Sequence, residues 1–423
     1  MPAPPFVGSS SAAGRVTALY TLPDVPIAAF QNAKLPGTVA NDRKLLLGGI
    51  GSDLWHSPGD PADQFWMVTD RGPNGLVPVA GVARRTFPIP EFTPTIIKVR
   101  AANGVIEILE ALPIVGQSGK PVTGLSNLEK IDETPYDFKA EALLPFNPNG
   151  LDTEGLVRTA SGDFWLVEEY SPSLVKLDAT GKVVKRYVPQ GLALTGTDYP
   201  VVDTLPAIFG KRKLNRGFEA LALSPDGKTL FIGLQSPLLN PDAATGNPSR
   251  MTRILAFDIA SEKVTGEYAY QFEPVAAFDT TAVRQPAEMK ISGLVALTNS
   301  SLLVLERTDW VAKLYRVDLT ADANILGSAW DSAATAPSLE AVTDAASANL
   351  KILSKSLAID LHELAGMPDK IEGVAVLDKN TLIVANDNDF DIGTLFDADG
   401  NNVGAGTKSR MLFITLTTPL PMP

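Results

Sequence analysis

Carboxylates stand at both ends of a pair of apolar runs that recurs along this sequence. One pair begins with Glu154 and ends with Glu168 and Glu169. Another begins with Glu372 and ends with Asp387. Oxygen donors in such numbers are typical of a site for a hard cation such as calcium, which takes about 6–8 oxygen ligands. A carboxylate close to a water molecule can also act as a general base. Either chemistry requires the fold to bring together residues that are far apart in the sequence.

Five segments share the pattern that carries these residues. Each begins with a small or acidic residue and a short apolar run, continues through a turn, and ends in a second apolar run with polar residues at its close. Turns rich in Asp, Asn and Gly between two such runs predict β-hairpins. The segments are SDLWHSPGDPADQFWMVTDRG, EGLVRTASGDFWLVEEYSP, EALALSPDGKTLFIGLQSP, SGLVALTNSSLLVLERTD and EGVAVLDKNTLIVANDND.

A second pair of strand-like runs accompanies most of these hairpins, for example at 95–114, 173–189 and 253–272. Four strands per repeat are typical of the blades of a β-propeller. We therefore predict an all-β chain that forms a propeller of five four-stranded blades. A sixth, degenerate blade stays open as an alternative, within 115–150 or 190–215.

The two ends of the chain complete the ring in this interpretation. The run RVTALYTLP at 15–23 can pair with RMLFITLTT at 410–418 and so complete the last blade. Residues 15–423 are thus predicted to form a single propeller domain, preceded by a flexible N-terminus at 1–14. These opening residues lack the basic and apolar regions of an intact signal peptide.

Hairpin geometry predicts where the polar ends of the five hairpins lie. The first residue of one strand lies beside the last residue of its antiparallel partner. If the hairpins are the two innermost strands of each blade, their polar ends converge on one mouth of the central channel. The carboxylates expected there are Asp70, Glu154, Glu168, Glu169, Glu219, Glu306, Glu372 and Asp387. The basic residues in the same segments are Arg71, Arg216, Lys290, Arg307 and Lys370.

So many carboxylates in one cavity repel each other and take up protons unless they are compensated. A bound cation supplies that compensation, and calcium is the candidate because the cage offers oxygen and the chain has only two histidines and no cysteine. The opposing interpretation is that Asp and Asn at strand ends merely bond their own turn backbone. The predicted metal ligands are Asp70, Glu154, Glu219, Glu372, Asn386 and Asp387.

Composition excludes other classes of function. The formal charge of −12, without any run rich in Lys or Arg, disfavours binding to nucleic acid. No apolar stretch reaches the roughly 20 residues needed to cross a bilayer, so membrane insertion is not expected. The expected partner is a small anionic or ester substrate, and the expected state is a monomer.

The segments with this pattern also resemble a known family. In order, the matching segments are TDRG (69–72), DTEGL (152–156), FWLVEEYSPSLVKLDATGK (164–182), NRGFEALALSPDGKTLFIGLQSPL (215–238), LLVLERTD (302–309) and KIEGVAVLDKNTLIVANDNDF (370–390). Together they resemble the phytase-like family known as "esterase-like activity of phytase", over residues from about 45 to 416. The resemblance implies a propeller fold, hydrolysis of phosphate or other esters, and a periplasmic or secreted location.

Two familiar hydrolase motifs are missing, because the sequence contains neither a G-x-S-x-G elbow nor an R-H-G segment. Metal-assisted hydrolysis remains. Glu168, Glu169 or Glu306 is the predicted proton acceptor, and Arg71 and Arg307 are the predicted clamp on an anionic group. Tyr170 either contacts substrate or closes the EEYSP turn. The predicted substrate-binding residues are Arg71, Arg216, Lys290, Arg307, Lys370 and Tyr170.

Three classes of function stay open at this point. The first is a calcium-dependent hydrolase of phosphate esters, phytase-like in the broad sense. The second is an esterase or lactonase with one buried calcium. The third is a non-catalytic propeller that binds a ligand or a protein and holds calcium for structure. Several metals or converging basic residues favour the first, and a single buried ion with an apolar rim favours the second.

Overall fold

The computed structural model describes residues 13–279, 285–393 and 396–422. Short β-strands dominate these ranges, and the α-helices among them are α1 (Ile27–Asn32) and α2 (Ala243–Gly246). None of the helices in the described ranges is long and apolar enough to cross a membrane. The prediction of a flexible segment at the N-terminus falls almost entirely on residues outside these ranges.

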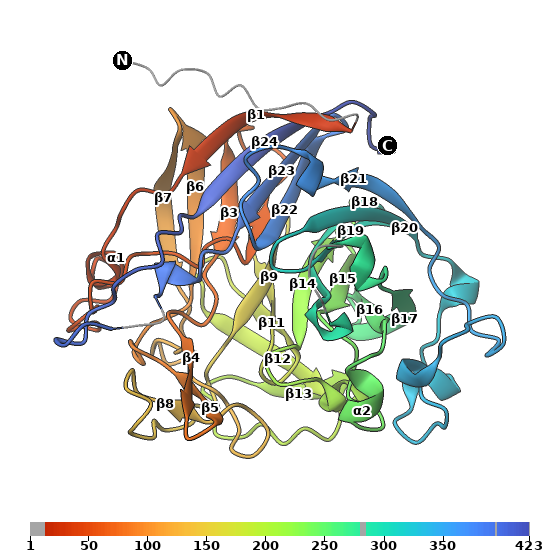
Figure 1. Cartoon of the computed structure of the whole chain (residues 1–423), viewed down its shortest axis with the longest axis horizontal. Helices are drawn as coiled ribbons and strands as arrows, with labels where there is room; N and C mark the ends of the chain where they lie inside the picture. The colour runs from red at the N-terminus through yellow and green to blue at the C-terminus, as the bar shows by residue number, and fades with distance from the viewer. Residues whose placement is uncertain (1–12, 280–284, 394–395, 423) are drawn as a thin grey trace.

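The strands form blades around a central channel (Figure 1). Within a blade, neighbouring strands are antiparallel, except that the outermost strand of the second blade runs parallel to its neighbour. From the channel outward, the first blade contains β2 (Asp53–Trp55), β3 (Gln64–Val68), β6 (Thr95–Ala102) and β7 (Val105–Pro113). The second contains β9 (Thr153–Arg158), β10 (Phe164–Glu168), β11 (Ser173–Leu177), β12 (Val183–Pro189) and β13 (Val201–Leu205).

The remaining three blades have four strands each. Their tight turns use the residues that the sequence offers, and Gly227 in the SPDG turn has φ 72°, which glycine adopts without steric cost. The third blade contains β14 (Phe218–Leu223), β15 (Thr229–Leu234), β16 (Met251–Asp258) and β17 (Lys263–Gln271). The fourth contains β18 (Lys290–Thr298), β19 (Ser301–Arg307), β20 (Ala312–Asp318) and β21 (Lys355–Asp360). The fifth contains β22 (Ile371–Asp378), β23 (Thr381–Asn386), β24 (Arg410–Leu416) and β1 (Gly14–Thr21).

The innermost strands close a ring around the channel. Strand β2 lies beside β9, β9 beside β14, β14 beside β18, β18 beside β22, and β22 again beside β2. The predicted propeller is therefore confirmed, and its ring contains five blades. Each predicted hairpin supplies the two innermost strands of one blade, which is the arrangement that sends the polar strand ends toward the channel.

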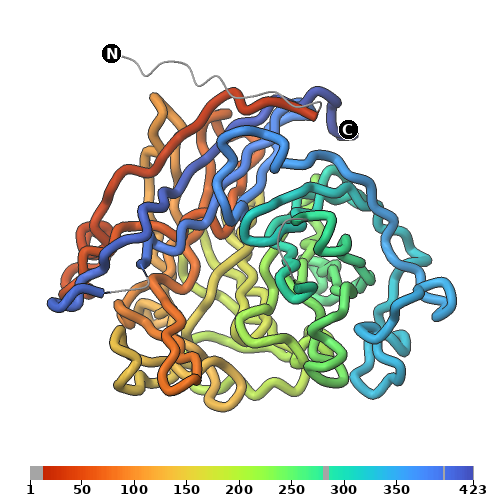
Figure 2. The backbone as a smooth tube through the Cα atoms, viewed as in Figure 1, coloured from red at the N-terminus to blue at the C-terminus, as the bar shows by residue number. Residues whose placement is uncertain are grey.

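The N-terminal strand closes the ring, as the sequence predicted. Strand β1 pairs antiparallel with β24 from Gly14 opposite Leu416 to Thr21 opposite Arg410. Figure 2 shows these two ends of the described chain running side by side across the top of the molecule. A single parallel bridge between Thr21 and Val105 then joins the fifth blade to the first.

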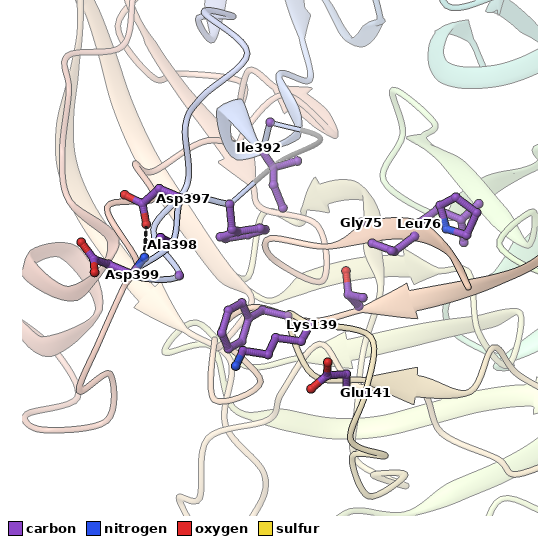
Figure 3. Close-up of a pocket in the computed structure, with 15 residues that line it drawn as sticks. Gly75, Leu76, Lys139, Glu141, Ile392, Asp397, Ala398 and Asp399 are labelled. Carbon is purple, nitrogen blue, oxygen red and sulfur yellow. Dashed lines mark hydrogen bonds between the residues drawn. The ribbon is translucent and has the colours of Figure 1, made fainter. Parts of the chain in front are cut away.

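Segments 115–150 and 190–215, which the structure describes in full, hold no sixth blade. The second contributes β13, a fifth strand of blade two. The first contributes only β8 (Pro135–Tyr136), which joins β4 (Gly75–Val79) and β5 (Val82–Thr86) in a small separate sheet. A cavity of about 710 Å³ adjoins this small sheet, with Leu76, Lys139 and Ile392 in its wall (Figure 3).

Apolar side chains between neighbouring blades form the core. Trp165 of β10 is fully buried, and its ring lies 5.8 Å from that of Tyr187 and 5.9 Å from that of Phe257 in the third blade. Each blade is covered on both faces by its neighbours, so its inner strands are apolar almost throughout, as in FWLVE at 164–168. Burying each large apolar side chain contributes about 1.5–3 kcal/mol.

The closing strand generates a stability prediction. Val16 is 2% exposed and belongs to the core between blades four and five, whereas its neighbour Arg15 points to solvent. We expect Val16→Asp to lower the free energy of unfolding by at least about 3 kcal/mol, because it buries an unpaired charge. Arg15→Asp introduces the same residue on the exposed face and should change the free energy by less than about 0.5 kcal/mol. Urea unfolding measures both, and equal losses would contradict closure by β1.

Candidate functional site

A β-bulge in the innermost hairpin of the second to fifth blades aims one side chain in each. In the third blade the pairing of β14 with β15 shifts between Phe218 and Ala220, which leaves Glu219 without a cross-strand partner. The same shift isolates Ser292 in the fourth blade and Glu372 in the fifth. A bulge of this kind bends the strand and redirects the extra residue. Here the extra glutamates enter the channel.

The residue after each bulge is small because the next innermost strand passes close to it. A β-carbon on Gly155 would lie 2.7 Å from the backbone nitrogen of Leu221, and one on Gly293 would lie 2.6 Å from a side chain of the fifth blade. In the first blade Asp53 takes this place, and its carboxylate accepts a 2.7 Å hydrogen bond from the backbone N–H of Leu156. The Glu-Gly and Ser-Gly pairs therefore encode the bulge and the close packing together.

The second strand of each hairpin ends in two residues whose side chains point to opposite faces, because side chains alternate along a strand. The second of the two faces the channel. Glu169 lines the channel cavity, whereas Glu168 is buried on the other face, where Arg186 pairs with it. The five channel-facing residues in this position are Asp70, Glu169, Gln235, Arg307 and Asp387.

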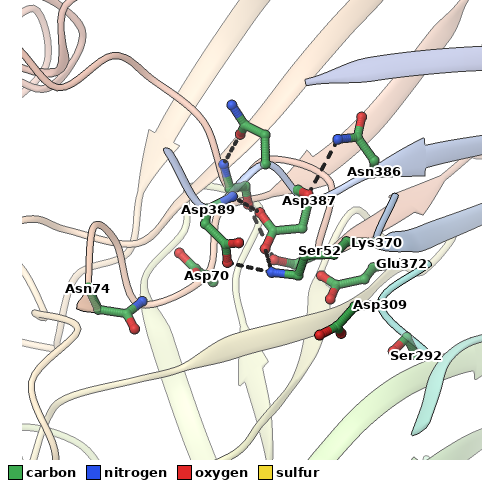
Figure 4. Close-up of polar contacts among 12 residues, drawn as sticks. Ser52, Asp70, Asn74, Ser292, Asp309, Lys370, Glu372, Asn386, Asp387 and Asp389 are labelled. Carbon is green, nitrogen blue, oxygen red and sulfur yellow. Dashed lines mark hydrogen bonds and ion pairs between the residues drawn. The ribbon is translucent and has the colours of Figure 1, made fainter. Parts of the chain in front are cut away.

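These side chains line a cavity of about 140 Å³ at the mouth of the channel, which we call the acidic cavity. Eight carboxylates and five basic side chains line it, so its formal charge is −3 with every group ionised. Figure 4 shows Lys370 reaching Asp387 and Asp389, with Asp70 and Glu372 alongside. The charged residues in the wall are Asp70, Asp152, Glu154, Glu169, Glu219, Glu372, Asp387, Asp389, Arg71, Arg85, Lys290, Arg307 and Lys370.

Two groups of carboxylates in this cavity are close enough to hold a metal ion. Oxygens of Glu154, Glu219 and Glu372 lie within 4.8 Å of one another, and so do oxygens of Asp152, Glu154 and Glu169. Glu154 belongs to both groups, which come from the second, third and fifth blades. All five residues are at most 8% exposed.

Burial and mutual repulsion disfavour the ionised form of this cluster. Burial, followed by repulsion from Glu219 and Asp152, raises the pKa of Glu154 well above its usual range. Burial raises the pKa of Glu372 to about 8, although the nearby Arg307 acts in the opposite direction. Burial and repulsion from Glu219 also raise the pKa of Glu169. A cation held between these groups would favour their ionised form.

Two oxygens of the cavity wall accept no hydrogen bond from the described residues. The side-chain amide of Gln235 donates to Glu169 at 2.8 Å and to Glu219 at 2.6 Å, while its carbonyl oxygen has no hydrogen-bond partner among the described residues. Oδ2 of Asp152 accepts no hydrogen bond from the described part of the chain and lies 3.0 Å from Arg71. No histidine of the described ranges lines the cavity. This donor set fits a hard cation.

Basic side chains divide the carboxylates into paired and unpaired groups. Arg307 pairs with Glu372 and, at 3.1 Å, with Asp309, and Ser292 accepts from its Nε at 2.8 Å. Lys290 reaches Asp309 at 2.8 Å. Burial, with repulsion from Arg307 and Arg216, lowers the pKa of Lys290 to about 8. Of the carboxylates in the two metal-binding groups, Glu154 and Glu169 have no Arg or Lys partner in the described part of the chain. Glu219 has only a distant one, because Arg307 approaches it to 4.0 Å.

Comparison with known proteins agrees with this architecture. The family described as "Phytase-like: Esterase-like activity of phytase" matches residues 46–390, which is most of the chain. The chain belongs to the phytase-like family. The match includes all five hairpins and therefore every carboxylate of the acidic cavity.

Relatives of this phytase-like chain are distant. An uncharacterized secreted protein of Arthroderma benhamiae is 27% identical over 263 residues, which cover 52% of this chain and 51% of the relative, so about half of each protein is matched. Among solved structures, the WD40 repeats of RRP9 have a TM-score of 0.38 at 10% identity, covering 96% of this chain and 99% of theirs. A calcium-binding protein, regucalcin, from Agrobacterium tumefaciens has a TM-score of 0.35 at 11% identity, covering 89% and 92%. Structural likeness at this level carries no information on function.

Two predicted site residues of the second blade of this phytase-like protein lie outside the acidic cavity. Glu168 is fully buried and pairs with Arg186, and it accepts from Ser173 at 2.7 Å. Tyr170 is 2% exposed, and its hydroxyl donates to the carbonyl of Gly124 at 2.6 Å. The predicted role of Glu168 as proton acceptor is corrected, because alternation along the strand directs it away from the channel. Of the two roles predicted for Tyr170, its placement does not favour contact with substrate, because its hydroxyl is bonded to Gly124.

Glu306 and Asn386 occupy the equivalent outward position in the fourth and fifth blades. Glu306 is fully buried and pairs with Tyr270 and Lys355. Both polar atoms of the Asn386 side-chain amide bond to backbone. Its oxygen accepts from the N–H of Arg410 at 2.8 Å, and its nitrogen donates to a backbone carbonyl. Figure 4 shows it at the side of the charged group. The predicted roles of Glu306 as base and Asn386 as metal ligand are therefore corrected.

The other predicted residues lie at the cavity. Asp70, Arg71, Lys290 and Lys370 are in its wall. Arg216 is not in the wall but lies close enough for Glu169 and Glu219 to act on it. Burial acts to raise the pKa of Asp387, but Lys370 and the hydrogen bonds from Asp389 together hold that pKa below its usual value.

The predicted site residues omitted several residues of the cavity wall, among them Asp152, Gln235, Arg85 and Asp389. Asp152 stands two positions before Glu154, and that spacing on a strand places two side chains on one face. Gln235 occupies the position equivalent to Glu169, so the repeat itself could have identified it. Arg85 lies on β5, and the sequence carries no signal that this hairpin folds over the channel mouth. Asp389 belongs to a turn in which residues 389–391 all have positive φ.

The two faces of β10 generate opposite predictions. Glu168→Gln leaves Arg186 buried without its charged partner, and we expect the free energy of unfolding to fall by about 3–5 kcal/mol. Glu169→Gln removes one of the mutually repelling carboxylates, and we expect the metal-free protein to become no less stable. Urea unfolding in the presence of a chelator measures both variants. A larger loss for Glu169→Gln than for Glu168→Gln would contradict the assignment of faces.

The raised pKa values predict how pH acts on the metal-free protein. Folded Glu372 titrates at about 8, against 4.5 when unperturbed. Between these values the folded state binds more protons than the unfolded state, so stability is greatest at the acid end and falls as pH rises toward about 8. We expect the Tm of chelated protein to fall over this range and calcium chloride to reverse the loss. Glu372→Gln should flatten the profile, and an unchanged slope in this variant would contradict the assignment.

Proposed function

We propose that this protein is a calcium-dependent hydrolase of phosphate esters that acts in the acidic cavity. The observation that carries the proposal is the pair of buried carboxylate groups that share Glu154 and are flanked by basic side chains. Membership of the phytase-like family supports hydrolysis of an ester as the reaction class.

The donor set favours calcium over other ions. The proposed ligands are carboxylate and amide oxygens on separate blades, and calcium accepts irregular cages of about 6–8 oxygens, whereas magnesium demands near-octahedral geometry. Glu154, Glu219 and Glu372 would hold one ion, and Asp152 and Glu169 together with Glu154 would hold a second. The free carbonyl oxygen of Gln235 is a further donor.

Charge favours a phosphate substrate when both groups are filled. With all groups ionised the cavity wall carries −3, from eight carboxylates and five basic side chains. One divalent ion brings this charge to −1 and two bring it to +1. Only the second value attracts a phosphate group, whose oxygens carry negative charge throughout the reaction.

A divalent cation bound there supplies positive charge to the ester oxygens on which negative charge develops. The chain itself supplies the remaining groups. Glu169 is proposed to accept the proton of the attacking water. Of the three predicted bases, Glu169 is the one that lines the cavity. Gln235 holds its carboxylate in place through a 2.8 Å hydrogen bond.

The basic residues are proposed to bind the anionic group. Arg71 keeps its Nε without a hydrogen-bond partner in the described part of the chain, so it can donate to substrate. Arg307 is already bonded to Glu372, Asp309 and Ser292, so its role is to neutralise and position those groups. Lys290 and Arg216 lie on the side of the third and fourth blades, where they add positive charge.

A second candidate is an esterase or lactonase with one calcium ion. The −1 charge left by a single divalent ion suits a neutral carboxylic ester better than a phosphate. A largely apolar cavity that shares Lys370 with the acidic one also suits such a substrate. The number of bound ions thus distinguishes the two candidates. We further propose that the protein acts as a monomer. We also propose that it acts outside the cytoplasm, because a relative is named as secreted.

Elemental analysis and activity assays test the proposal together. We expect at least one calcium per chain, and loss of activity with a chelator that calcium restores. The substrates are 4-nitrophenyl phosphate, phytate, 4-nitrophenyl acetate and a lactone. Glu154→Gln and Glu219→Gln should lose metal and lower kcat/KM by at least about 100-fold. Glu110→Gln, at an exposed position on β7, is the matched control and should retain both.

The outcomes separate the three classes of function. Two ions with turnover of phosphate esters support the principal proposal, and one ion with turnover of acetate or lactone supports the second candidate. Bound metal without turnover of any substrate supports a non-catalytic propeller. Protein that binds no metal and does not respond to chelator would eliminate both hydrolase proposals.

A further inference from the structure

Two arginines of the acidic cavity contact the same carboxylate. Arg85 of β5 donates to Glu133 from Nε and from Nη2, at 3.0 Å in each case. Arg71 approaches the same carboxylate at 3.5 Å through Nη1. Both arginines line the cavity, whereas Glu133 is not part of its wall. We call Arg71, Arg85 and Glu133 the arginine clamp.

Neighbouring segments hold the arginine clamp in place. Strand β5 pairs with β8, with Arg85 opposite Pro135, so the strand that carries Arg85 is joined to the segment that carries Glu133. The side-chain oxygen of Asn74 accepts a further hydrogen bond from Nη1 of Arg85 at 2.8 Å. Burial acts to raise the pKa of Glu133, but Arg71 and Arg85 hold that pKa below its usual value. Glu133 is therefore ionised at neutral pH and orients the guanidinium groups.

Both guanidinium groups keep N–H groups that no described residue accepts. Nε and Nη2 of Arg71 have no hydrogen-bond partner in the described part of the chain, although the residue is only 5% exposed. These two atoms form one edge of the planar group, and that edge matches two oxygens of a phosphate or carboxylate. Arg85 makes three hydrogen bonds to described residues, which leaves two of its N–H groups without such a partner. Buried donors without partners cost free energy, so an oxyanion that accepts from them would be stabilised here.

The arginine clamp adjoins one of the two groups of carboxylates that are close enough to hold a metal ion. Nη1 of Arg71 lies 3.0 Å from Oδ2 of Asp152, which belongs to the group with Glu154 and Glu169. An oxyanion bound by Arg71 therefore lies beside that group. Because the ionised carboxylates repel an anion, binding to the clamp is measured on protein in calcium chloride.

We propose that the arginine clamp binds a terminal phosphate group, with N–H groups of both arginines donating to its oxygens. The substrate class is then a phosphate monoester, which presents three unesterified oxygens. A diester presents two and brings a second substituent, which a cavity of about 140 Å³ must also hold. Hydrolysis of the monoester rests on the proposed function, whereas binding of an oxyanion by the clamp does not.

Calorimetry with inorganic phosphate tests the arginine clamp without turnover. We expect phosphate to bind the wild type, and to bind Arg71→Gln and Arg85→Gln at least about tenfold more weakly, because each change removes charge-assisted hydrogen bonds. Arg85→Lys keeps the charge but not the planar set of donors, so it should not restore the affinity. Arg84→Gln is the matched control and should keep the affinity. Arg84 lies on the same strand but outside the cavity wall, and it donates to the carbonyl of Ala140 at 2.7 Å.

Substrate selectivity tests the class of ester. We expect the wild type to have a higher kcat/KM for 4-nitrophenyl phosphate than for bis(4-nitrophenyl) phosphate. The ratio should fall at least about tenfold in Arg85→Gln and stay unchanged in Arg84→Gln. Circular dichroism checks that each variant is folded. If buried Arg71→Gln does not fold, Arg85→Gln decides, because Arg85 lies on the hairpin of β4 and β5 and not in a blade.

The outcomes separate this inference from the proposed function. If no ester is hydrolysed but phosphate binding depends on the two arginines, the proposed function fails and the oxyanion site stands. If esters are hydrolysed and phosphate binds Arg85→Gln as tightly as the wild type, the clamp is overturned and the proposed function stands. Full affinity in Arg85→Lys, an equal loss in Arg84→Gln, or no binding of phosphate to the wild type also overturns the clamp. An unchanged ratio of monoester to diester turnover in Arg85→Gln overturns the assignment to monoesters.

Discussion

Repulsion among buried carboxylates is the constraint on which the rest of this structure depends. Glu154, Glu219 and Glu372 come from three blades, yet their oxygens lie within 4.8 Å of one another. Like charges at this separation, largely removed from water, raise each other's pKa and oppose folding. The ring must therefore be held by interactions elsewhere, and the apolar contacts between blades and the closing strand β1 supply them. A cluster maintained at such a cost in free energy is a site that a cation would stabilise.

The bulges and glycines of the innermost strands are the local devices that build this cluster. The pairing shift at Glu219 and Glu372 turns a side chain inward, and a glycine such as Gly373 or Gly155 then lets the adjacent strand approach. Neither device acts alone. Without the bulge the glutamate would keep its place in the alternation, and without the glycine the innermost strands would be forced apart.

The carboxylates that do not reach the cavity have a structural role. Glu168 with Arg186, and Glu306 with Lys355 and Tyr270, form buried charged contacts on the outward faces of β10 and β19. These contacts tie together strands that are not adjacent within a blade, β10 with β12 and β19 with β21, and Tyr270 joins the third blade to the fourth. The adjacent residues Glu168 and Glu169 therefore have different roles. Glu168 supports the fold, and Glu169 is available for chemistry.

The sequence by itself determined the five hairpins, the pairing of the two chain ends and the convergence of Glu154, Glu219 and Glu372. It could do so because hairpin patterns and strand periodicity are local properties of the chain. Only the tertiary structure decided that Glu169 and Arg307 face the channel while Glu168, Glu306 and Asn386 do not, because the phase of the alternation depends on pairing and bulges. It alone brought Arg85 to the channel mouth, because the position of β5 depends on how a long connection folds over the blades.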